Sequence, residues 1–292
     1  MSARSPFVRL LGLGGIWGTS FLLIKIALEG LPPLGIALGR SVAGALTLWV
    51  YVALRRRPVP VDARTWGKLA FVGLVANAIP FALFSWGELH VTSGVAGIYN
   101  ATTPLFTLAI AIAFLPAERA TRERTAGLLL GFAGIVVVLG PWRGIGENSV
   151  LGQVACLGAS ASYGVGLVYV RRVVSPLRLD VVAQTACQLT AACLMLGTGV
   201  VLTGGDVDLT PRVVSAVLAL GALGTGIALI IYNSLIRDVG PTTTSLVTFV
   251  VPVIAVALGA VALGEPVTWN LFAGALVVVA GVALAEGRLR RA

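Results

Sequence analysis

The sequence has few charged residues and little of the chemistry that metal sites need. Charged side chains make up 11% of the 292 residues, whereas soluble domains carry about 25%. There is one histidine, and the spacing of the three cysteines (Cys156, Cys187 and Cys193) matches no zinc or iron–sulfur pattern. We therefore expect no metal site and interpret the cysteines as small buried side chains.

The sequence also lacks a recognisable active site. Ser160 has no histidine nearby, and there is no HExxH motif or pair of aspartates. An intramembrane enzyme would need such a nucleophile–base pair or a metal cluster, so the sequence argues against an enzyme. The net charge of +9 does not indicate a nucleic-acid partner, because the basic residues are spread among short loops.

Hydrophobic sequence is abundant instead, at 57% of the residues with a mean hydropathy of +0.96. A membrane-spanning helix needs about 20 apolar residues. Ten segments meet this requirement: 7–28, 33–54, 66–87, 93–114, 125–141, 150–170, 181–203, 212–236, 242–263 and 268–286. The sequence therefore predicts an all-α integral membrane protein whose ten helices are joined by loops too short for a soluble catalytic domain.

The basic residues between these segments are distributed unequally. If the segments alternate in direction, 17 Lys and Arg residues lie on the side of the N-terminus and two, Arg143 and Arg212, on the other. Cytoplasmic loops are enriched in Lys and Arg. We therefore predict that both termini are cytoplasmic.

The two halves of the chain resemble each other. Residues 73–115 align with 221–263 at an offset of 148, and after one deletion Glu118 aligns with Glu265. The predicted units are residues 1–145 and 146–292, with five helices each. Because five is odd, the second unit has the opposite membrane orientation. Inverted repeats of this kind are typical of secondary transporters, which bind substrate where the repeats meet.

Several motifs resemble the drug/metabolite transporter superfamily, EamA type. They are Trp17–Phe21, Arg40, Gly87–Ala96, Pro104–Phe106 and Ala117–Arg119 in the first half, and Ala159–Tyr163, Pro252 and Gly264–Glu265 in the second. Within it, the aromatic first-half helices are most similar to the aromatic amino-acid exporters of the YddG-like branch. The resemblance implies export of small metabolites across the bacterial inner membrane, without a cofactor or ATP. Sugar or nucleotide conjugates and drugs, moved in exchange for protons, are the alternative cargo, and a non-transporting receptor or scaffold is a remote one.

Neutral polar and aromatic side chains are the candidates for substrate binding, because an apolar cavity with a few hydrogen-bonding groups suits a flat organic molecule. They are Trp17, Phe21, Asn77, Trp86, Tyr99, Asn100, Thr103, Ser160, Tyr163 and Thr248. For Trp86, anchoring at the membrane interface is an equally good explanation. Pro104 and Pro252, near the centres of matched helices, are candidate hinges or tolerated packing kinks.

Charged side chains are expected only near the membrane surface. Lys25, Arg40 and His90 are predicted to lie at the outer mouth, where the two cations could snorkel to headgroups. Alternatively, Arg40 could pair with a helix C-terminus or attract a substrate carboxylate. All 12 acidic residues fall at segment ends or in loops. An interior free of acids leaves two possibilities, facilitated diffusion or coupling through another group. We expect a monomer or homodimer in the bilayer.

Overall fold

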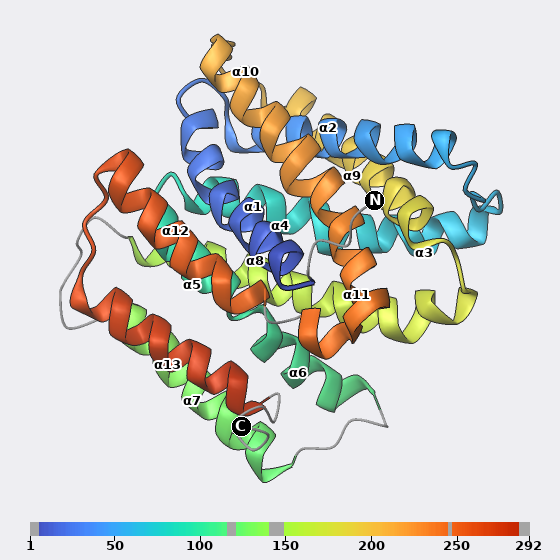
Figure 1. The fold of residues 1–292 in the computed structure, drawn as a ribbon. Helices are drawn as coiled ribbons and strands as arrows, with labels where there is room; N and C mark the ends of the chain where they lie inside the picture. Colours follow the sequence, from blue (N-terminus) through green and yellow to red (C-terminus); the bar gives the residue numbers. More distant parts are fainter. Residues whose placement is uncertain (1–5, 116–120, 140–148, 245–246, 286–292) are drawn as a thin grey trace.

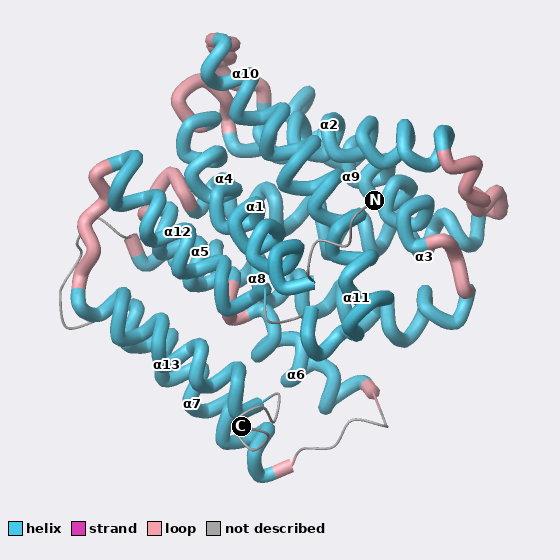
Figure 2. The backbone as a smooth tube through the Cα atoms, viewed as in Figure 1, coloured by secondary structure: helices cyan, strands magenta, loops and turns pink. Residues whose placement is uncertain are grey.

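A computed structural model describes residues 6–115, 121–139, 149–244 and 247–285, and these residues form helices and no strands (Figures 1 and 2). The predicted boundary between residues 145 and 146 and the matched Glu118 lie outside these ranges. The elements are α1 (Pro6–Ala27), α2 (Pro33–Leu54), α3 (Ala63–Gly73), η1 (Leu74–Ala78), α4 (Ile79–Gly87), α5 (Ser93–Asn100), α6 (Thr103–Phe114), α7 (Arg122–Leu139), α8 (Val150–Tyr169), η3 (Val170–Val174), η4 (Ser175–Leu177), α9 (Val181–Thr203), α10 (Pro211–Leu218), η5 (Ala219–Ile227), α11 (Ala228–Thr244), α12 (Val247–Leu263) and α13 (Trp269–Ala285).

Seven helical stretches are long and apolar enough to cross a membrane. They are Pro6–Ala27, Pro33–Leu54, Ala63–Gly87, Ser93–Phe114, Val150–Leu177, Val181–Thr203 and Pro211–Leu235, and two shorter apolar helices follow at Val250–Leu263 and Trp269–Leu284. The all-helical prediction is confirmed for the described residues. The count of ten crossings and the cytoplasmic termini stay predictions.

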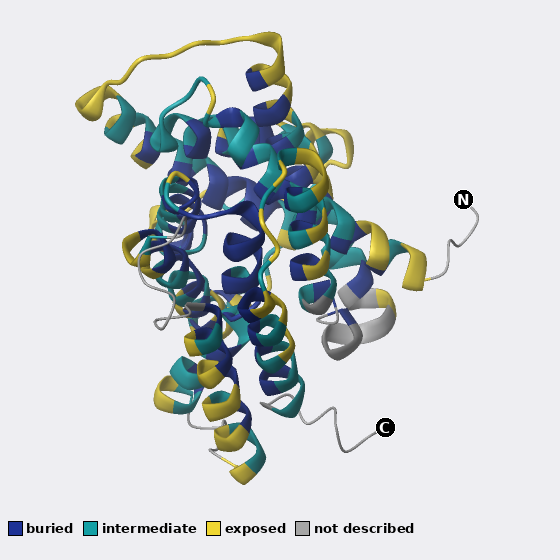
Figure 3. Ribbon diagram, turned by 90° about the vertical axis from the view of Figure 1, so that its left-hand side faces the viewer, coloured by how far each residue is buried: buried dark blue, intermediate teal, exposed yellow. Residues whose placement is uncertain are grey.

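Large apolar side chains cover much of the outer surface. Leu54, Val201, Leu202 and Val261 are each exposed over more than three quarters of their area, and exposed residues follow the outer faces of the helices in Figure 3. Soluble proteins do not expose hydrophobic surface on this scale. The outer faces are therefore suited to lipid.

Side-chain caps start several helices where the sequence changes from loop to hydrophobic segment. Asp62, Thr92, Asp180 and Thr210 each accept a hydrogen bond from a backbone N–H in the first turn of the helix that follows. Such caps satisfy donors that the helix itself leaves unpaired. The backbone N–H of Thr65 holds the pKa of the Asp62 carboxyl below its usual value.

The helices are interrupted at positions that proline alone does not predict. Pro104 follows a break between α5 and α6, as expected, but α12 runs through Pro252 without a break. The third and eighth hydrophobic segments instead contain π-helical turns, η1 and η5. The offset of 148 places η1 within η5.

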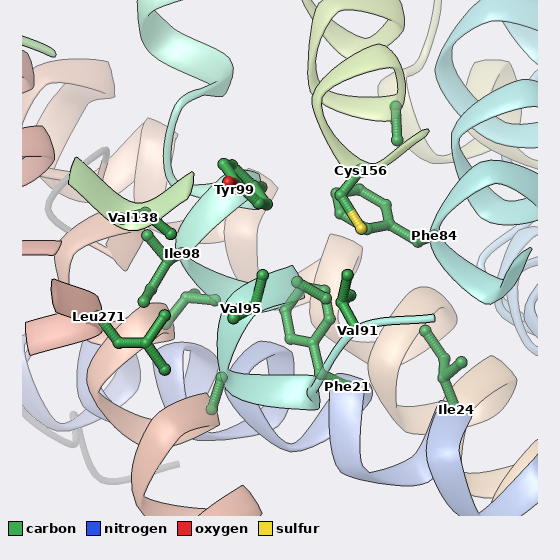
Figure 4. Packing of buried hydrophobic residues seen from close by; sticks show 14 of the residues in the cluster. Phe21, Ile24, Phe84, Val91, Val95, Ile98, Tyr99, Val138, Cys156 and Leu271 are labelled. Atoms are coloured by element: carbon green, nitrogen blue, oxygen red, sulfur yellow. The ribbon is translucent and has the colours of Figure 1, made fainter. Parts of the chain in front are cut away.

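The main core lies among α1, α4, α5 and α8, with α12 and α13 beside it. In Figure 4, Phe21, Phe84 and Cys156 pack around α5, whose Val95, Ile98 and Tyr99 are fully buried. Glycines on α5 permit the close approach of α12, since a Cβ at Gly94 would lie 3.2 Å from the Cα of Val256. This core fixes the position of α4 and of the residue that ends it, Glu88.

Helices α7 and α13 pack side by side through glycines (Figure 1). A Cβ at Gly281 would lie 2.5 Å from the Cα of Gly131 and 2.8 Å from the carbonyl oxygen of Gly127. The small-xxx-small pattern of Gly127 and Gly131 favours such close approach. The backbones of the two helices are therefore in direct contact.

We expect Gly281→Ala to lower the thermal stability of the detergent-solubilised protein. The new methyl group meets backbone atoms that cannot rotate away, and overpacking of this kind costs about 1–3 kcal/mol. Gly197→Ala in α9 is the matched control, because no heavy atom lies within 4 Å of its Cβ position. Equal melting temperatures for the two variants would contradict the close contact.

Candidate functional site

A guanidinium group lies where α2 meets the π-helical turn η5. Arg40 is half-buried, and its Nε donates to Thr225 Oγ1 at 2.9 Å. Its Cζ lies 3.9 Å from the centroid of the Phe81 ring, within the range of cation–π attraction. Its terminal nitrogens make no hydrogen bond within the described residues, so the cation is held in place while donors stay available for an anion.

Two half-buried aromatic residues, Trp17 and Tyr163, interact with Arg40 or with the segment that binds it. The Trp17 indole nitrogen donates to the carbonyl of Gly224, next to Thr225, at 3.1 Å. Tyr163 on α8 interacts electrostatically with Arg40, and it packs against both of the larger cores. We call Trp17, Arg40, Phe81, Tyr163 and Thr225 the central cluster.

Several other predicted substrate-binding residues are packed in the core. Tyr99 is fully buried, and its hydroxyl donates to Gln153 Oε1. Ser160 is also fully buried, and its hydroxyl donates to the carbonyl of Tyr99 at 2.7 Å. Phe21 and Asn77 are buried as well. In this conformation these four side chains are buried inside the protein and line no open surface.

The remaining central candidates lie near helix interruptions. Asn100 and Thr103 are half-buried at the break between α5 and α6, where the Thr103 hydroxyl donates to the Asn100 carbonyl at 2.8 Å. Thr248 is half-buried on α12, one turn before Pro252. Their roles in substrate binding, and those of Pro104 and Pro252 as hinges, stay predictions.

Lys25 and His90 line a common pocket of about 450 Å³. We call it the mouth pocket; its lining is Lys25, Leu89, His90, Val91, Thr92, Leu263, Gly264, Glu265 and Pro266. The His90 ring packs against the ring of half-buried Trp86, with 4.5 Å between the two ring centroids. Arg40 does not line this pocket and instead contacts Phe81 and Thr225; its place at the outer mouth of the membrane stays a prediction.

Acidic residues contribute to the site in a way that sequence reasoning missed. Glu265 accepts hydrogen bonds from Ser93 N and Oγ at 2.8 Å each and from Gly94 N at 3.2 Å, so it caps the N-terminus of α5, where anions are favoured. Glu88 ends α4, as its position in the sequence indicates, but it is 0% exposed. The expectation of an interior free of acids is wrong, because neighbouring helices cover this helix end.

Comparison with known proteins gives one consistent family. The model of the EamA-like transporter family matches residues 8–140 and 150–286. The uncharacterized inner membrane transporter YedA of Escherichia coli (strain K12) is 31% identical over 257 residues, which cover 87% of this chain and 81% of that protein. A probable amino-acid metabolite efflux pump of Salmonella typhimurium is 26% identical, over 97% of this chain and 94% of the pump.

A solved structure supports the same fold. A crystal structure superimposes over the full length of both chains with a TM-score of 0.70 and 23% sequence identity. At that identity the likeness concerns the fold alone. Together with the apolar helices, the family match makes this chain a membrane transporter: it belongs to the EamA-like transporter family, within the drug/metabolite transporter superfamily.

Proposed function

We propose that this protein exports amino acids, including aromatic ones, across the bacterial inner membrane by alternating access. It would do so with ten membrane-spanning helices, both termini in the cytoplasm, as a monomer or homodimer. The relative named as an amino-acid metabolite efflux pump supports this choice of substrate. The 17 basic residues predicted on one side of the membrane support the orientation.

Features of the two halves support alternating access. The family model matches each half separately, and the π-helical turns η1 and η5 occur at positions that the repeat pairs. Two similar halves of opposite orientation can exchange conformations, so that one rocking motion opens a shared site to either side. The mouth pocket, lined by residues of both halves, is one place where such a motion would open or close a path.

The proposed substrate class rests on the central cluster. Arg40 offers free guanidinium donors for a carboxylate, and the half-buried Trp17 and Tyr163 offer aromatic rings within the same cluster. A rigid cation beside aromatic side chains suits a molecule with a carboxylate and a flat apolar group. Aromatic amino acids have both groups.

Uptake by proteoliposomes tests the proposal. Purified protein without an ion gradient should give saturable uptake of labelled phenylalanine, tryptophan and threonine, and other aromatic amino acids should suppress it. Protein-free liposomes are the control for leakage. Uptake no faster than in those liposomes, with folded protein in the membrane, would reject amino acids as substrates.

A further inference from the structure

Glu88 is a buried acid that the transport site described so far does not use. It follows Gly87 at the end of α4, where its backbone N–H continues the helix by donating to the Phe84 carbonyl at 2.9 Å. The residue is 0% exposed, and neither carboxylate oxygen has a hydrogen-bond partner within the described part of the chain. A buried side chain of this kind requires an explanation.

The charged groups around Glu88 are bound to other partners. Lys25 on α1 donates to the backbone carbonyl of Glu88 and not to its carboxylate. Arg40 on α2 is engaged by Thr225 and Phe81. Both cations still act on the Glu88 carboxylate through space, and so does the negative charge of Glu265.

One further titratable group, the Cys156 thiol of α8, faces this region; it is fully buried and interacts electrostatically with Glu88. The surroundings thus provide two cations and one competing anion, none of them bonded to the carboxylate oxygens. Burying an ionised carboxylate without hydrogen bonds is costly, and binding a proton removes the charge. The balance between the ionised and the protonated form of Glu88 therefore depends on the neighbouring charges.

We propose that the Glu88 carboxyl is a proton-binding site whose occupancy controls substrate binding at Arg40. One carboxylate oxygen takes a proton from water that enters through the mouth pocket, forming a neutral acid, and returns it to water when the O–H bond breaks. Lys25 connects the two places, since it lines the pocket and contacts the Glu88 backbone. The inference about substrate rests on the proposed function; the proton site itself does not.

The direction in which pH changes the substrate affinity follows from the charge of Glu88. Ionised Glu88 attracts Arg40 and repels a substrate carboxylate that approaches the same guanidinium. Protonation removes that competition, so the apparent affinity for a carboxylate substrate should rise as pH falls. Coupling between sites is typically worth fivefold or more in affinity, and we expect about fivefold across the titration of Glu88.

Infrared spectroscopy of the full chain in nanodiscs tests the proton site without any substrate. As the pH is lowered from alkaline to acidic values, the wild type should gain one carboxylic-acid C=O band that Glu88→Gln lacks. Glu29→Gln is the matched control and should leave the band unchanged, because the Glu29 side chain is 48% exposed and pairs with Arg212 at 3.2 Å. Identical spectra for wild type and Glu88→Gln would overturn the proposal.

Two further measurements extend the test. Lys25→Met keeps Glu88 but removes a nearby cation, so the midpoint of the Glu88 band should move to higher pH. This variant replaces Glu88→Gln in the test if Glu88→Gln fails to fold. A midpoint at the same pH as in the wild type would contradict the assignment of the band to Glu88. Half-saturation of phenylalanine exchange should depend on pH in the wild type but not in Glu88→Gln. If the wild type transports phenylalanine with a half-saturation constant that does not depend on pH, the coupling between Glu88 and Arg40 is refuted. If the wild type shows the infrared band but no transport, only the amino-acid substrate is rejected.

Discussion

Replacing Arg40 with alanine should cause the largest loss of amino-acid transport of any single change in the central cluster. The guanidinium is the only cation in that cluster, and its terminal donors are available within the described structure. Truncating one partner of a buried charge pair costs about 2–5 kcal/mol. The substrate concentration for half-maximal transport should therefore rise by roughly 30-fold or more, as measured by exchange in proteoliposomes.

Conservative changes separate charge from geometry at this position. Arg40→Lys keeps the cation but loses the planar set of donors that binds Thr225 and a carboxylate together, so we expect an intermediate loss. Arg212→Ala is the control, since that arginine is 63% exposed on α10 and pairs with Glu29. Amines without a carboxylate should compete equally poorly against phenylalanine in the wild type, whatever their ring. Normal affinity in folded Arg40→Ala would exclude Arg40 from binding.

Local sequence signals predict much of the helical architecture. Pro33 and Pro211 occupy the first turn of α2 and α10, and Asp62 and Asp180 cap α3 and α9. These features act within one turn of the chain, so sequence alone reveals them. The glycines of α7 likewise indicate a close helix partner, although identifying α13 as that partner requires the structure.

The environment of the charged residues cannot be predicted in the same way. Position along a hydrophobic segment places Arg40 in the outer third of its helix, yet Thr225, which is 185 residues away in the chain, holds it in the central cluster. Glu88 is similarly at a helix end by sequence and fully buried in the fold. Burial of a helix end is decided by which other helices cover it, and those contacts are long-range. The two π-helical turns share no sequence signature, because η5 contains three glycines whereas η1 contains neither glycine nor proline.

Tyr99→Ala should destabilise the protein, whereas Trp17→Ala should mainly impair transport. From the sequence, both residues are candidates for substrate contact, but their surroundings differ. Tyr99 is fully buried in the main core with its hydroxyl on Gln153, and truncating a buried aromatic residue costs about 3–5 kcal/mol. Trp17 is half-buried, and its indole nitrogen donates to the carbonyl of Gly224, the residue before Thr225, so its ring can contact substrate. We expect at least about a fivefold loss of phenylalanine affinity in Trp17→Ala, because stacked aromatic pairs and their buried area contribute on the order of 1–3 kcal/mol.

Milder variants test whether Tyr99 mainly stabilises the fold and Trp17 mainly binds substrate. Tyr99→Phe removes only the bond to Gln153, so it should lower the melting temperature far less than Tyr99→Ala and leave the substrate affinity unchanged. Trp17→Phe keeps a ring face but loses the indole donor to Gly224, so it should retain more affinity than Trp17→Ala. Melting temperatures and half-saturation constants on the same preparations give both readouts. If Tyr99→Ala were as stable as the wild type and lost substrate affinity, Tyr99 would have to become accessible in another conformation of the transport cycle, and the binding site would include α5.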